Sequence, residues 1–597
     1  MRTTRLPRLG RTSEGRIAAS RIPRASRISR RASGPAIAVV VLALGAACSA
    51  SAAARPAGGR SAARERRAVA VIRSTQRERR ARPARPPRAL KRGVGAPAQP
   101  LLVSDVGSLS SDERLLFTAL QGIANRTGPH VYLLGLDDTS ATWLRLAVPL
   151  ATEHVAPYEL LARLRSTVRG LVVWDPNLPT DTQNVATTWA GLENLLPASP
   201  ELAARLSKPP YSLRVVHDLR DEHFSSRAAA YDWALSHLGP PSRFGLLAWI
   251  GGPSSGPRHG IRDLVVARRG FAFQANPESD ASTVQKILGA FPALTAVYGY
   301  PCLDDQISGQ SGVPACEPAG VGEISRAGKF LVPTDLAANL SVDSWFRPLA
   351  EHPPWSSSPA PLDPTKTYVT FVISDGDNVG ANEEWLLEHQ WADPARGTIP
   401  MGISISPRLS LLAPRIYDYF VHTLTPNDVL VAGPSGAGYV YPGLDPDLSG
   451  YLDQTRRLMA LSGLRAVWIL DNGYAYSPSP QTVQSYVEAL HPPAIFTDYF
   501  GATFPNPPAT YLSEGVPVIH AVWGPDVTTT TWRVEGAAYT YPTRPAFVFV
   551  ALNTWTMGFT QARQVMQALG PSYEVVRPDR FAAMLQRAGG VAVPAVP

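Results

Sequence analysis

The amino-acid sequence predicts an α/β protein with two parts: an N-terminal α/β domain over residues 100–351 and a C-terminal (β/α)8, TIM-like barrel over residues 365–590. Short apolar runs, typical of strands, alternate with amphipathic stretches, typical of helices. Between the two parts, the Pro- and Ser-rich segment 352–364 (HPPWSSSPAPLDP) cannot sustain a helix or a central strand. With 597 residues, 45% of them hydrophobic, the chain can bury large cores, which excludes disordered, collagen-like and disulfide-dense proteins.

Residues 1–54 predict an export signal. Arg30 and Arg31 precede the apolar run 36–47 (AIAVVVLALGAA), and small residues follow it. Twelve apolar residues are too few to span a bilayer, which needs about 20. We therefore expect a secreted or envelope-associated protein, with no stable membrane span after signal removal, and the Arg pair is compatible with twin-arginine export. A membrane anchor and lipidation at Cys48 are the alternatives.

The positive charge of the chain is confined to its N-terminus. The net charge is +9, but residues 1–100 hold 24 of the 57 Lys and Arg and only 3 of the 48 Asp and Glu, which leaves the remainder at −12. Residues 55–99, rich in Arg and Pro, predict a disordered basic linker. Because the folded part is acidic, a nucleic acid is excluded as the expected partner.

Two of the three cysteines lie beyond the export signal. Cys302 and Cys316 flank a polar loop, LDDQISGQSGVPA. In an oxidising compartment this spacing predicts one local disulfide. Two unpaired thiols and half of a zinc site are the alternatives, although neither cysteine belongs to a close pair.

The N-terminal part begins with a helix signal at residues 110–124, where Ser, Asp and Glu precede an apolar stripe. The strands that we expect after it are short apolar runs at residues 131–134, 171–174, 213–216, 244–250, 294–298 and 330–332.

The C-terminal part has a more regular alternation, with eight strand-like runs at residues 368–374, 402–406, 429–432, 466–470, 494–497, 517–522, 546–552 and 573–576. Helical stretches stand between most of them, at residues 414–424, 448–461, 482–490 and 561–569. Eight such units match the size of a (β/α)8 barrel. Residues 528–545 (TTTTWRVEGAAYTYPTRP) predict a long loop, which is the weakest point of this interpretation.

In such a barrel the residues just after each strand face the active site. Read in this way, the candidate site residues are Asp375, Asp377, Asn378, Arg408, the segment from Ser435 to Tyr441, Asp471, Asn472, Asp498, Tyr499, His520, Trp523, Asn553 and Trp555. Aromatic faces stack on sugar rings, and carboxylates, amides and Arg bond to hydroxyls. The set therefore fits a sugar pocket, as it fits many other polar small-molecule sites.

Several motifs carry a family resemblance. Residues 436–442 read GAGYVYP, a G-x-G-Y-x-Y-P signature, and residues 374–378 read SDGDN. Together with LQGIANR at 120–126 and DLAANL at 335–340, they make the chain resemble the bacterial GxGYxYP family over about residues 101–590. The resemblance implies a secreted carbohydrate-active protein, expected to be a glycoside hydrolase, with an N-terminal α/β domain and a barrel-like C-terminal domain.

Glycoside hydrolysis usually needs two carboxylates on opposite sides of the scissile bond. Asp471 and Asp498 follow consecutive expected strands and are the first candidates, although one of them could instead cap a helix or pair with Arg408. Asp375 and Asp377 are catalytic or substrate-binding candidates as well. The alternatives for these two are a cation site with Asn378, or turn and capping chemistry.

The tyrosines of GAGYVYP, Tyr439 and Tyr441, are expected to stack on substrate, or else to pack beneath the barrel rim. The loop is neither a dinucleotide nor a phosphate-binding fingerprint, and Ser435 does not lie in a nucleophile elbow. We expect an oligo- or polysaccharide substrate and neither a cofactor nor a metal, and we leave the oligomeric state open. A non-catalytic glycan-binding or envelope protein is the main alternative, and a metal-dependent polysaccharide deacetylase is a weaker one.

Overall fold

The computed structural model describes residues 100–251, 261–301, 316–348, 351–356, 358, 361–471, 477–498 and 510–589. The expected export signal, Cys48 and the basic linker lie outside the described residues. Within the described ranges, no helix combines the length and apolar character that crossing a membrane requires.

The N-terminal region contains three small sheets, each entirely parallel. The first has the order β2-β1-β3 and is built from β1 (Leu101–Asp105), β2 (Val131–Leu134) and β3 (Thr152–His154). The second has the order β5-β4-β6 and is built from β4 (Gly170–Val173), β5 (Leu195–Ala198) and β6 (Val215–Asp218). The third has the order β10-β9-β7-β8 and is built from β7 (Leu247–Trp249), β8 (Phe271–Phe273), β9 (Ala296–Gly299) and β10 (Phe330–Pro333).

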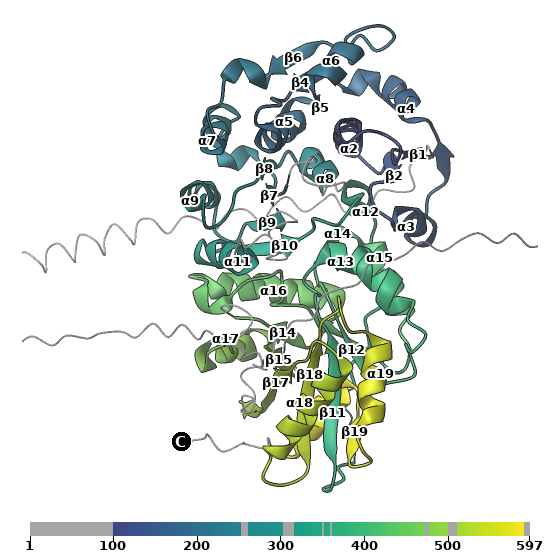
Figure 1. Ribbon diagram of the computed structural model, residues 1–597, viewed down its shortest axis with the longest axis vertical. Helices are drawn as coiled ribbons and strands as arrows, with labels where there is room; N and C mark the ends of the chain where they lie inside the picture. Colours follow the sequence, from purple (N-terminus) through teal and green to yellow (C-terminus); the bar gives the residue numbers. More distant parts are fainter. Residues whose placement is uncertain are drawn as a thin grey trace, which may run out of the picture. The chain divides into compact units, whose positions relative to one another are not determined.

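Helices accompany these sheets (Figure 1). The first, α2 (Ser111–Ala124), begins where the sequence predicts, because Ser110 and Glu113 form a capping box. The others are α3 (Ser140–Ala147), α4 (Pro157–Arg163), α5 (Pro179–Glu193), α6 (Pro200–Leu206), α7 (Arg227–His237), α8 (Arg262–Ala267), α9 (Ala281–Ala290), α11 (Cys316–Arg326) and α12 (Leu340–Asp343).

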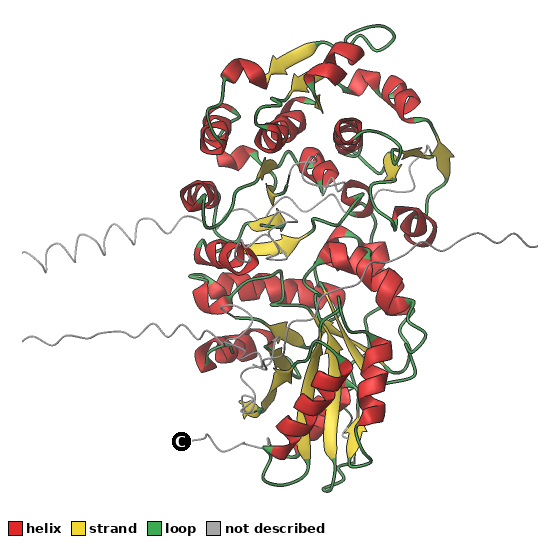
Figure 2. Cartoon of the chain, viewed as in Figure 1, coloured by secondary structure: helices red, strands yellow, loops and turns green. Residues whose placement is uncertain are grey.

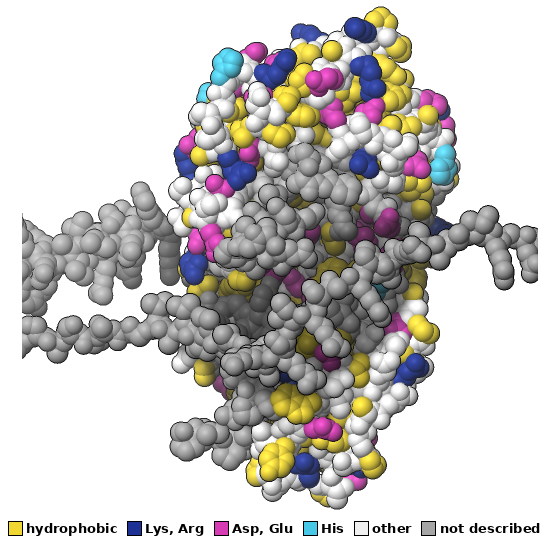
Figure 3. All heavy atoms as spheres, viewed as in Figure 1, with side chains coloured by type: hydrophobic (Ala, Val, Ile, Leu, Met, Phe, Trp, Pro, Cys, Tyr) yellow, Lys and Arg dark blue, Asp and Glu magenta, His cyan; other side chains and the backbone are white. Residues whose placement is uncertain are grey.

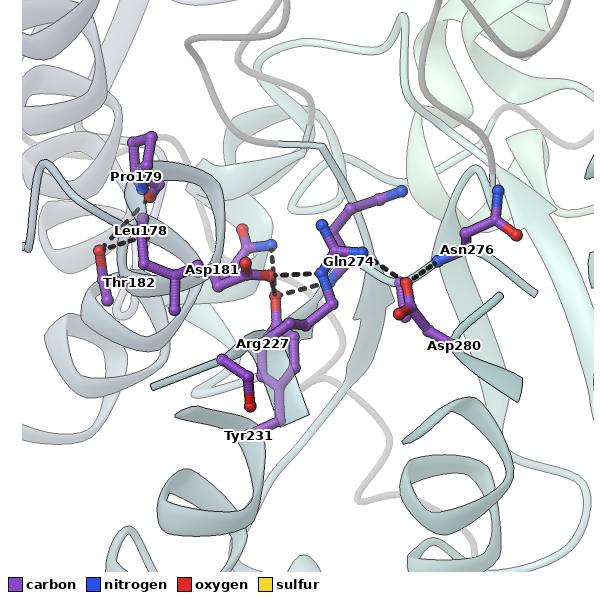
Figure 4. Close-up of polar contacts among 12 residues, drawn as sticks. Leu178, Pro179, Asp181, Thr182, Arg227, Tyr231, Gln274, Asn276 and Asp280 are labelled. Carbon is purple, nitrogen blue, oxygen red and sulfur yellow. Dashed lines mark hydrogen bonds and ion pairs between the residues drawn. The ribbon is translucent and has the colours of Figure 1, made fainter. Parts of the chain in front are cut away.

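A polar cluster joins the second and third sheets (Figure 4). The carboxylate of Asp181 on α5 accepts hydrogen bonds from Arg227 and Tyr231 of α7, at 3.0 and 2.9 Å. The Tyr231 hydroxyl also accepts from the backbone N–H of Gln274, just after β8, and Arg227 pairs with Asp280. Each charge therefore has an opposite partner, which offsets the cost of burial.

The two N-terminal motifs lie against each other. Gln121 of LQGIANR donates to Asn339 of DLAANL at 2.7 Å, and Asn125 donates to Ser341 at 2.9 Å. Asn339 also accepts from the backbone of Leu133 in β2. These amides therefore fasten α2 and β2 to the segment after β10.

The C-terminal region is a closed barrel of seven parallel strands, with the remaining strands on its outside. The barrel strands are β11 (Thr367–Ile373), β12 (Met401–Ile405), β13 (Asp428–Ala432), β14 (Val467–Ile469), β15 (Ile495–Thr497), β17 (Val516–Val522) and β18 (Ala546–Leu552). Another strand, β16 (Tyr511–Ser513), pairs antiparallel with β17. Each of the eight predicted strand runs forms a strand, but the prediction of an eight-stranded barrel is wrong.

The eighth run, β19 (Tyr573–Val575), is excluded from the barrel by the way β11 is shared. A strand has two edges, and β18 occupies one edge of β11. On the other edge, the first residues of β11, Thr367–Val369, pair with β19, and its last residues, Val372 and Ile373, pair with β12. The barrel thus closes from β11 to β12 directly.

Helices surround the barrel strands (Figure 2). They are α13 (Val379–Glu383), α14 (Leu409–Leu412), α15 (Pro414–His422), α16 (Leu448–Ser462), α17 (Pro480–Leu490), α18 (Val527–Tyr539), α19 (Phe559–Ala568) and α20 (Pro578–Arg587). The predicted loop at 528–545 is wrong, because most of it is α18. Asp526 caps this helix, and its buried residues Thr530, Val534, Ala537 and Ala538 recur at helical spacing. The run of four threonines hides that stripe in the sequence.

The barrel interior is filled with aromatic side chains. Phe549 of β18 contacts Trp468 of β14 and Phe496 of β15, with ring centroids 5.5 and 5.0 Å apart. A filled interior leaves the ends of the strands as the place for a site.

Candidate functional site

The segment Gly436–Pro442, which we call the motif loop, follows β13 and pairs with the third sheet. The backbone N–H and C=O of Tyr439 bond to Leu331 of β10 at 2.7 and 2.8 Å. A Cβ on Gly438 would lie 2.4 Å from the Leu331 carbonyl oxygen, and Gly436 has φ +130° with Thr455 equally close. Both glycines are therefore required by close packing.

The Tyr439 hydroxyl of the motif loop contacts a carboxylate from the N-terminal region, and the Tyr441 hydroxyl lies beside that of Tyr439. Their rings are buried, with 3% of Tyr439 and 1% of Tyr441 exposed. The Tyr439 hydroxyl donates to Glu317 at 3.1 Å and lies 3.4 Å from the Tyr441 hydroxyl. Glu317, on α11, also accepts a hydrogen bond from Tyr300. In this arrangement the tyrosines present hydroxyls to the site and no exposed ring face.

Four carboxylates, Asp375, Asp377, Glu317 and Asp471, are near enough to this place to act electrostatically on Asp377 or Tyr441. Burial first, and then the negative charges of Asp375 and Glu317, raise the pKa of Asp377 well above its ordinary value. Burial also raises the pKa of Tyr441, and Glu317, Asp471 and Asp377 add to that rise. Asp375 and Asp377 are partly exposed to solvent, and we call Asp375, Asp377, Glu317 and Asp471 together the acidic recess.

Asp375 connects this cluster to an exposed aromatic surface. It has φ +63°, accepts a hydrogen bond from Ser374 at 2.8 Å, and accepts another from the indole N–H of Trp555 at 2.5 Å. Trp555 is 40% exposed, and its ring lies 4.7 Å from that of Trp385, on which His389 stacks. A carboxylate and an exposed indole thus meet at the rim of the barrel.

Asp471 and Asp498, the first predicted pair, have different partners in the described residues. Asp471 is 5% exposed and accepts the backbone N–H of Gly443, just after the motif loop, at 2.9 Å. Asp498 is 2% exposed and contacts His520 at 2.7 Å.

The pair of Asp498 and His520 faces the outside of the barrel. Phe496 of β15 points inward, and Ile519 and Ala521 of β17 share its interior cluster. Since side chains alternate along a strand, Thr497 and His520 point outward, and their side chains are bonded at 2.9 Å. A φ of +68° turns Asp498 toward the same side.

Arg408, Asn378 and Asn553 bond to nearby backbone. Arg408 is buried, donates to the Ala437 carbonyl of the motif loop at 2.8 Å, and lies over Phe330. Asn378 caps α13. Asn553 accepts the backbone N–H of Trp555 at 2.9 Å.

The guanidinium of Arg533 lies over the Trp523 ring. Ser435 is buried, and its hydroxyl bonds to the carbonyls of Val440 and Leu470. Asn472 and Tyr499 lie outside the described residues.

Comparisons with known sequence families match most of this chain. Residues 365–586 match the "GxGYxYP putative glycoside hydrolase C-terminal domain". The GxGYxYP_N first domain, the GxGYxYP_N second domain and the GxGYxYP third domain match residues 100–151, 168–241 and 247–345. The chain belongs to the GxGYxYP family.

A solved structure supports the fold of this GxGYxYP protein. It is a crystal structure of "a putative hydrolase from Bacteroides thetaiotaomicron VPI-5482", similar with a TM-score of 0.71 and 23% identity. The similarity covers 85% of this chain and 99% of that one. No functionally curated protein matches the chain.

Only one of the two cysteines in the expected disulfide lies in the described residues. Cys316, the first residue of α11, is buried and disulfide-bonded. Cys302 lies outside the described residues, so their pairing stays a prediction. In the part of the chain that the structure describes, no group of three or more His, Cys, Asp or Glu side chains is placed to hold a metal ion.

Sequence reasoning missed Glu317. Its position, after Cys316 and at the start of a helix, is not the end of a barrel strand. The one signal in the sequence is Cys316, because a cysteine that is expected to form a disulfide indicates that the backbone beside it is held in place.

Proposed function

We propose that this GxGYxYP protein is a secreted glycoside hydrolase that cleaves an oligo- or polysaccharide at the recess around Asp377. The observation that carries the proposal is the 2.5 Å hydrogen bond between Trp555 and Asp375, because it joins the acidic cluster to an exposed aromatic surface. A glycosidase needs both features side by side: carboxylates for acid and base chemistry, and a flat apolar surface for the pyranose ring. The family description and the hydrolase of similar fold are in keeping with it.

Asp377 is the proposed general acid. A carboxyl group can protonate a leaving-group oxygen near neutral pH only if it still holds its proton there. Burial and the neighbouring charges of Asp375 and Glu317 favour that protonated form.

Glu317 is the proposed second carboxylate, acting as base or nucleophile. Hydrogen bonds from the hydroxyls of Tyr439 and Tyr300 stabilise its ionised form. Two carboxyl groups in one recess would then have opposite protonation states, which is the arrangement an acid and base pair requires.

Trp555 and Trp385 form the proposed substrate platform. The C–H face of a pyranose ring packs on an indole, and Trp555, which is 40% exposed, is hydrogen-bonded to Asp375. A sugar stacked there would bring its glycosidic bond next to the acidic cluster.

The test is incubation of the purified protein with a panel of microbial and plant polysaccharides, with and without chelator. Products are analysed by mass spectrometry for new reducing ends and for released acetate. The proposal expects reducing ends that resist the chelator and vanish in Asp377→Asn. The matched control is Asp453→Asn, which changes an exposed carboxylate on α16 and should act like the wild type. Chelator-sensitive acetate would indicate a deacetylase, and a retained glycan without product would indicate a binding protein.

A further inference from the structure

A cavity of about 350 Å³ lies away from the acidic recess. Its walls come from the segment before β11 (His352, Trp355) and from the ends of α16 and α17. Leu464 and Arg465 precede β14, and Leu490 and His491 precede β15. The cavity is therefore at the amino ends of these strands, whereas Asp375 and Asp377 follow the carboxyl end of β11.

The polar lining of this cavity is basic. Arg456, Arg465, His352 and His491 line it, and none of the described lining residues is Asp or Glu. Arg456 also pairs with Asp453 at 3.1 Å, but both side chains are more than half exposed, so solvent screens that pair. A basic cavity stands out in a chain whose residues beyond 100 carry a net charge of −12. Its charge is complementary to an anion.

The rest of the lining is apolar. Trp355 forms one wall, and Met459, Leu464 and Leu490 contribute further apolar surface. A bare inorganic anion would use only the cationic groups. A ligand that carries an anionic group on a ring with an apolar face would use both kinds of surface, since indole packs on C–H faces and Arg binds carboxylate through two parallel hydrogen bonds. The volume is within the range of small-molecule sites.

The segment before β11 packs closely against the end of α16. Gly463, the C-cap of α16, has φ +74°, and a Cβ there would lie 2.4 Å from Cγ of His352. The imidazole is therefore seated against the end of α16, and the glycine makes the space for it.

We propose that this cavity binds a sugar acid, with its carboxylate on Arg456 and Arg465 and its ring against Trp355. This site is independent of the proposed hydrolase activity, because it shares no residue with the acidic recess. A structural explanation exists for Arg465 and His491, which follow the last residues of α16 and α17, because positive charge stabilises helix C-termini. That explanation predicts an effect of Arg465 on stability but none on ligand binding, so the two are separable.

The experiment is isothermal titration calorimetry of the purified protein with glucuronate, glucose and inorganic phosphate. We expect saturable binding of glucuronate and none of glucose. Arg465→Gln and Arg456→Gln should each weaken glucuronate binding about tenfold or more, since each loses a charge-assisted hydrogen bond. Arg457→Gln is the matched control, because Arg457 is exposed on the same helix and does not line the cavity. Trp355→Ala should weaken the binding of glucuronate but not that of phosphate.

Several results would overturn the proposal. Absence of glucuronate binding to the wild type would do so, and so would equal binding by Arg465→Gln and the Arg457→Gln control. Phosphate bound as tightly as glucuronate, with no effect of Trp355→Ala, would reduce the site to a simple anion site and refute the sugar acid. Hydrolase activity plays no part in these readouts, so the failure of either proposal is recognisable by itself.

Discussion

Two carboxyl clusters in the described residues differ in access: the recess, where the pKa of Asp377 is raised, and a second cluster, where the pKa values of Asp263, Asp343 and Glu383 are raised. In the recess, Asp377 keeps some exposure and its neighbour Asp375 touches a Trp ring that is 40% exposed. In the second cluster, Asp263, Asp343 and Glu383 are 1, 3 and 4% exposed. In both clusters, burial and the negative charge of neighbouring carboxylates raise the pKa values.

The second cluster lies where the N-terminal region meets the barrel. Glu383 belongs to α13 of the barrel, and its backbone carbonyl accepts the indole N–H of Trp143 on α3 at 2.7 Å. Burial, and then the charges of Asp263 and Asp137, raise the pKa of Asp343 well above its ordinary value. A raised pKa therefore identifies a candidate site only when a substrate can reach the group.

Asp377→Asn should lower kcat by about 10²–10⁴-fold, because the amide cannot donate a proton to the leaving group. Release of reducing ends, measured under saturating substrate, gives kcat. The thermal transition should stay near that of the wild type. Wild-type kcat in this variant would remove the recess from the chemistry and leave the two clusters equivalent.

Glu317→Gln should lower kcat/KM by about 100-fold, since it removes an ionised group from the same recess. The variant keeps the length of the side chain, and one of its amide oxygen contacts with Tyr439 or Tyr300 can persist. The pH profile is the deciding measurement: the acidic limb of kcat/KM should flatten if Glu317 acts as a base. An unchanged limb with lower stability would make Glu317 a purely structural partner of the tyrosines.

Gly438→Ala should destabilise the protein by about 1–3 kcal/mol, because the new methyl group would lie 2.4 Å from the Leu331 carbonyl oxygen. Urea unfolding followed by circular dichroism measures the change. Gly289→Ala is the matched control: Gly289 lies in α9 with nothing within 4 Å of the added Cβ, so stability should rise slightly. Equal effects of the two changes would contradict the role given to the motif loop.

Trp555→Ala should raise KM about tenfold and lower kcat less, because it removes stacking surface and one hydrogen bond to Asp375. Initial rates over a range of oligosaccharide concentrations separate the two constants. A fall in kcat at constant KM would mean that the indole acts on Asp375 and not on the sugar.

Asp343→Asn should have the smallest effect and none on activity. The folded pKa of Asp343 is raised, so the folded state holds a proton that the unfolded chain releases. Its contribution to the free energy of unfolding is thus complete below the ordinary pKa of Asp, about 4, and is lost as pH rises toward the folded pKa. Asn does not titrate. The urea midpoint of the variant should therefore fall less between pH 5 and pH 8 than that of the wild type, and an equal fall would contradict the assignment.

The strands of the barrel could be predicted because each is a short apolar run between turn residues. The number of strands in the closed barrel could not, since β19 and β12 compete for the same edge of β11 and the length of each pairing decides the outcome. Helix α18 was missed because β-branched threonines carry weak helical preference, and only its buried stripe defines it.

The candidate site residues could be predicted only where they directly follow, in the sequence, the strand that positions them. Asp375 and Asp377 lie at a strand end in sequence and in structure. For Asp498, a backbone φ of +68° sends the side chain toward His520, outside the barrel, and no residue pattern encodes that choice. Glu317 reaches the site through the pairing of β10 with the motif loop, a contact between segments about 110 residues apart.

The pairing of β10 with the motif loop limits where the chain can be divided into separately expressed parts. The boundary between the family domains at 247–345 and 365–586 separates residues that contact each other. Leu331 and Glu317 lie on one side of it, and Tyr439, to which both are bonded, lies on the other. A barrel expressed by itself would expose the unpaired backbone edge of the motif loop and lose one of the recess carboxylates. Recombination between homologues should therefore succeed only when both segments come from the same parent.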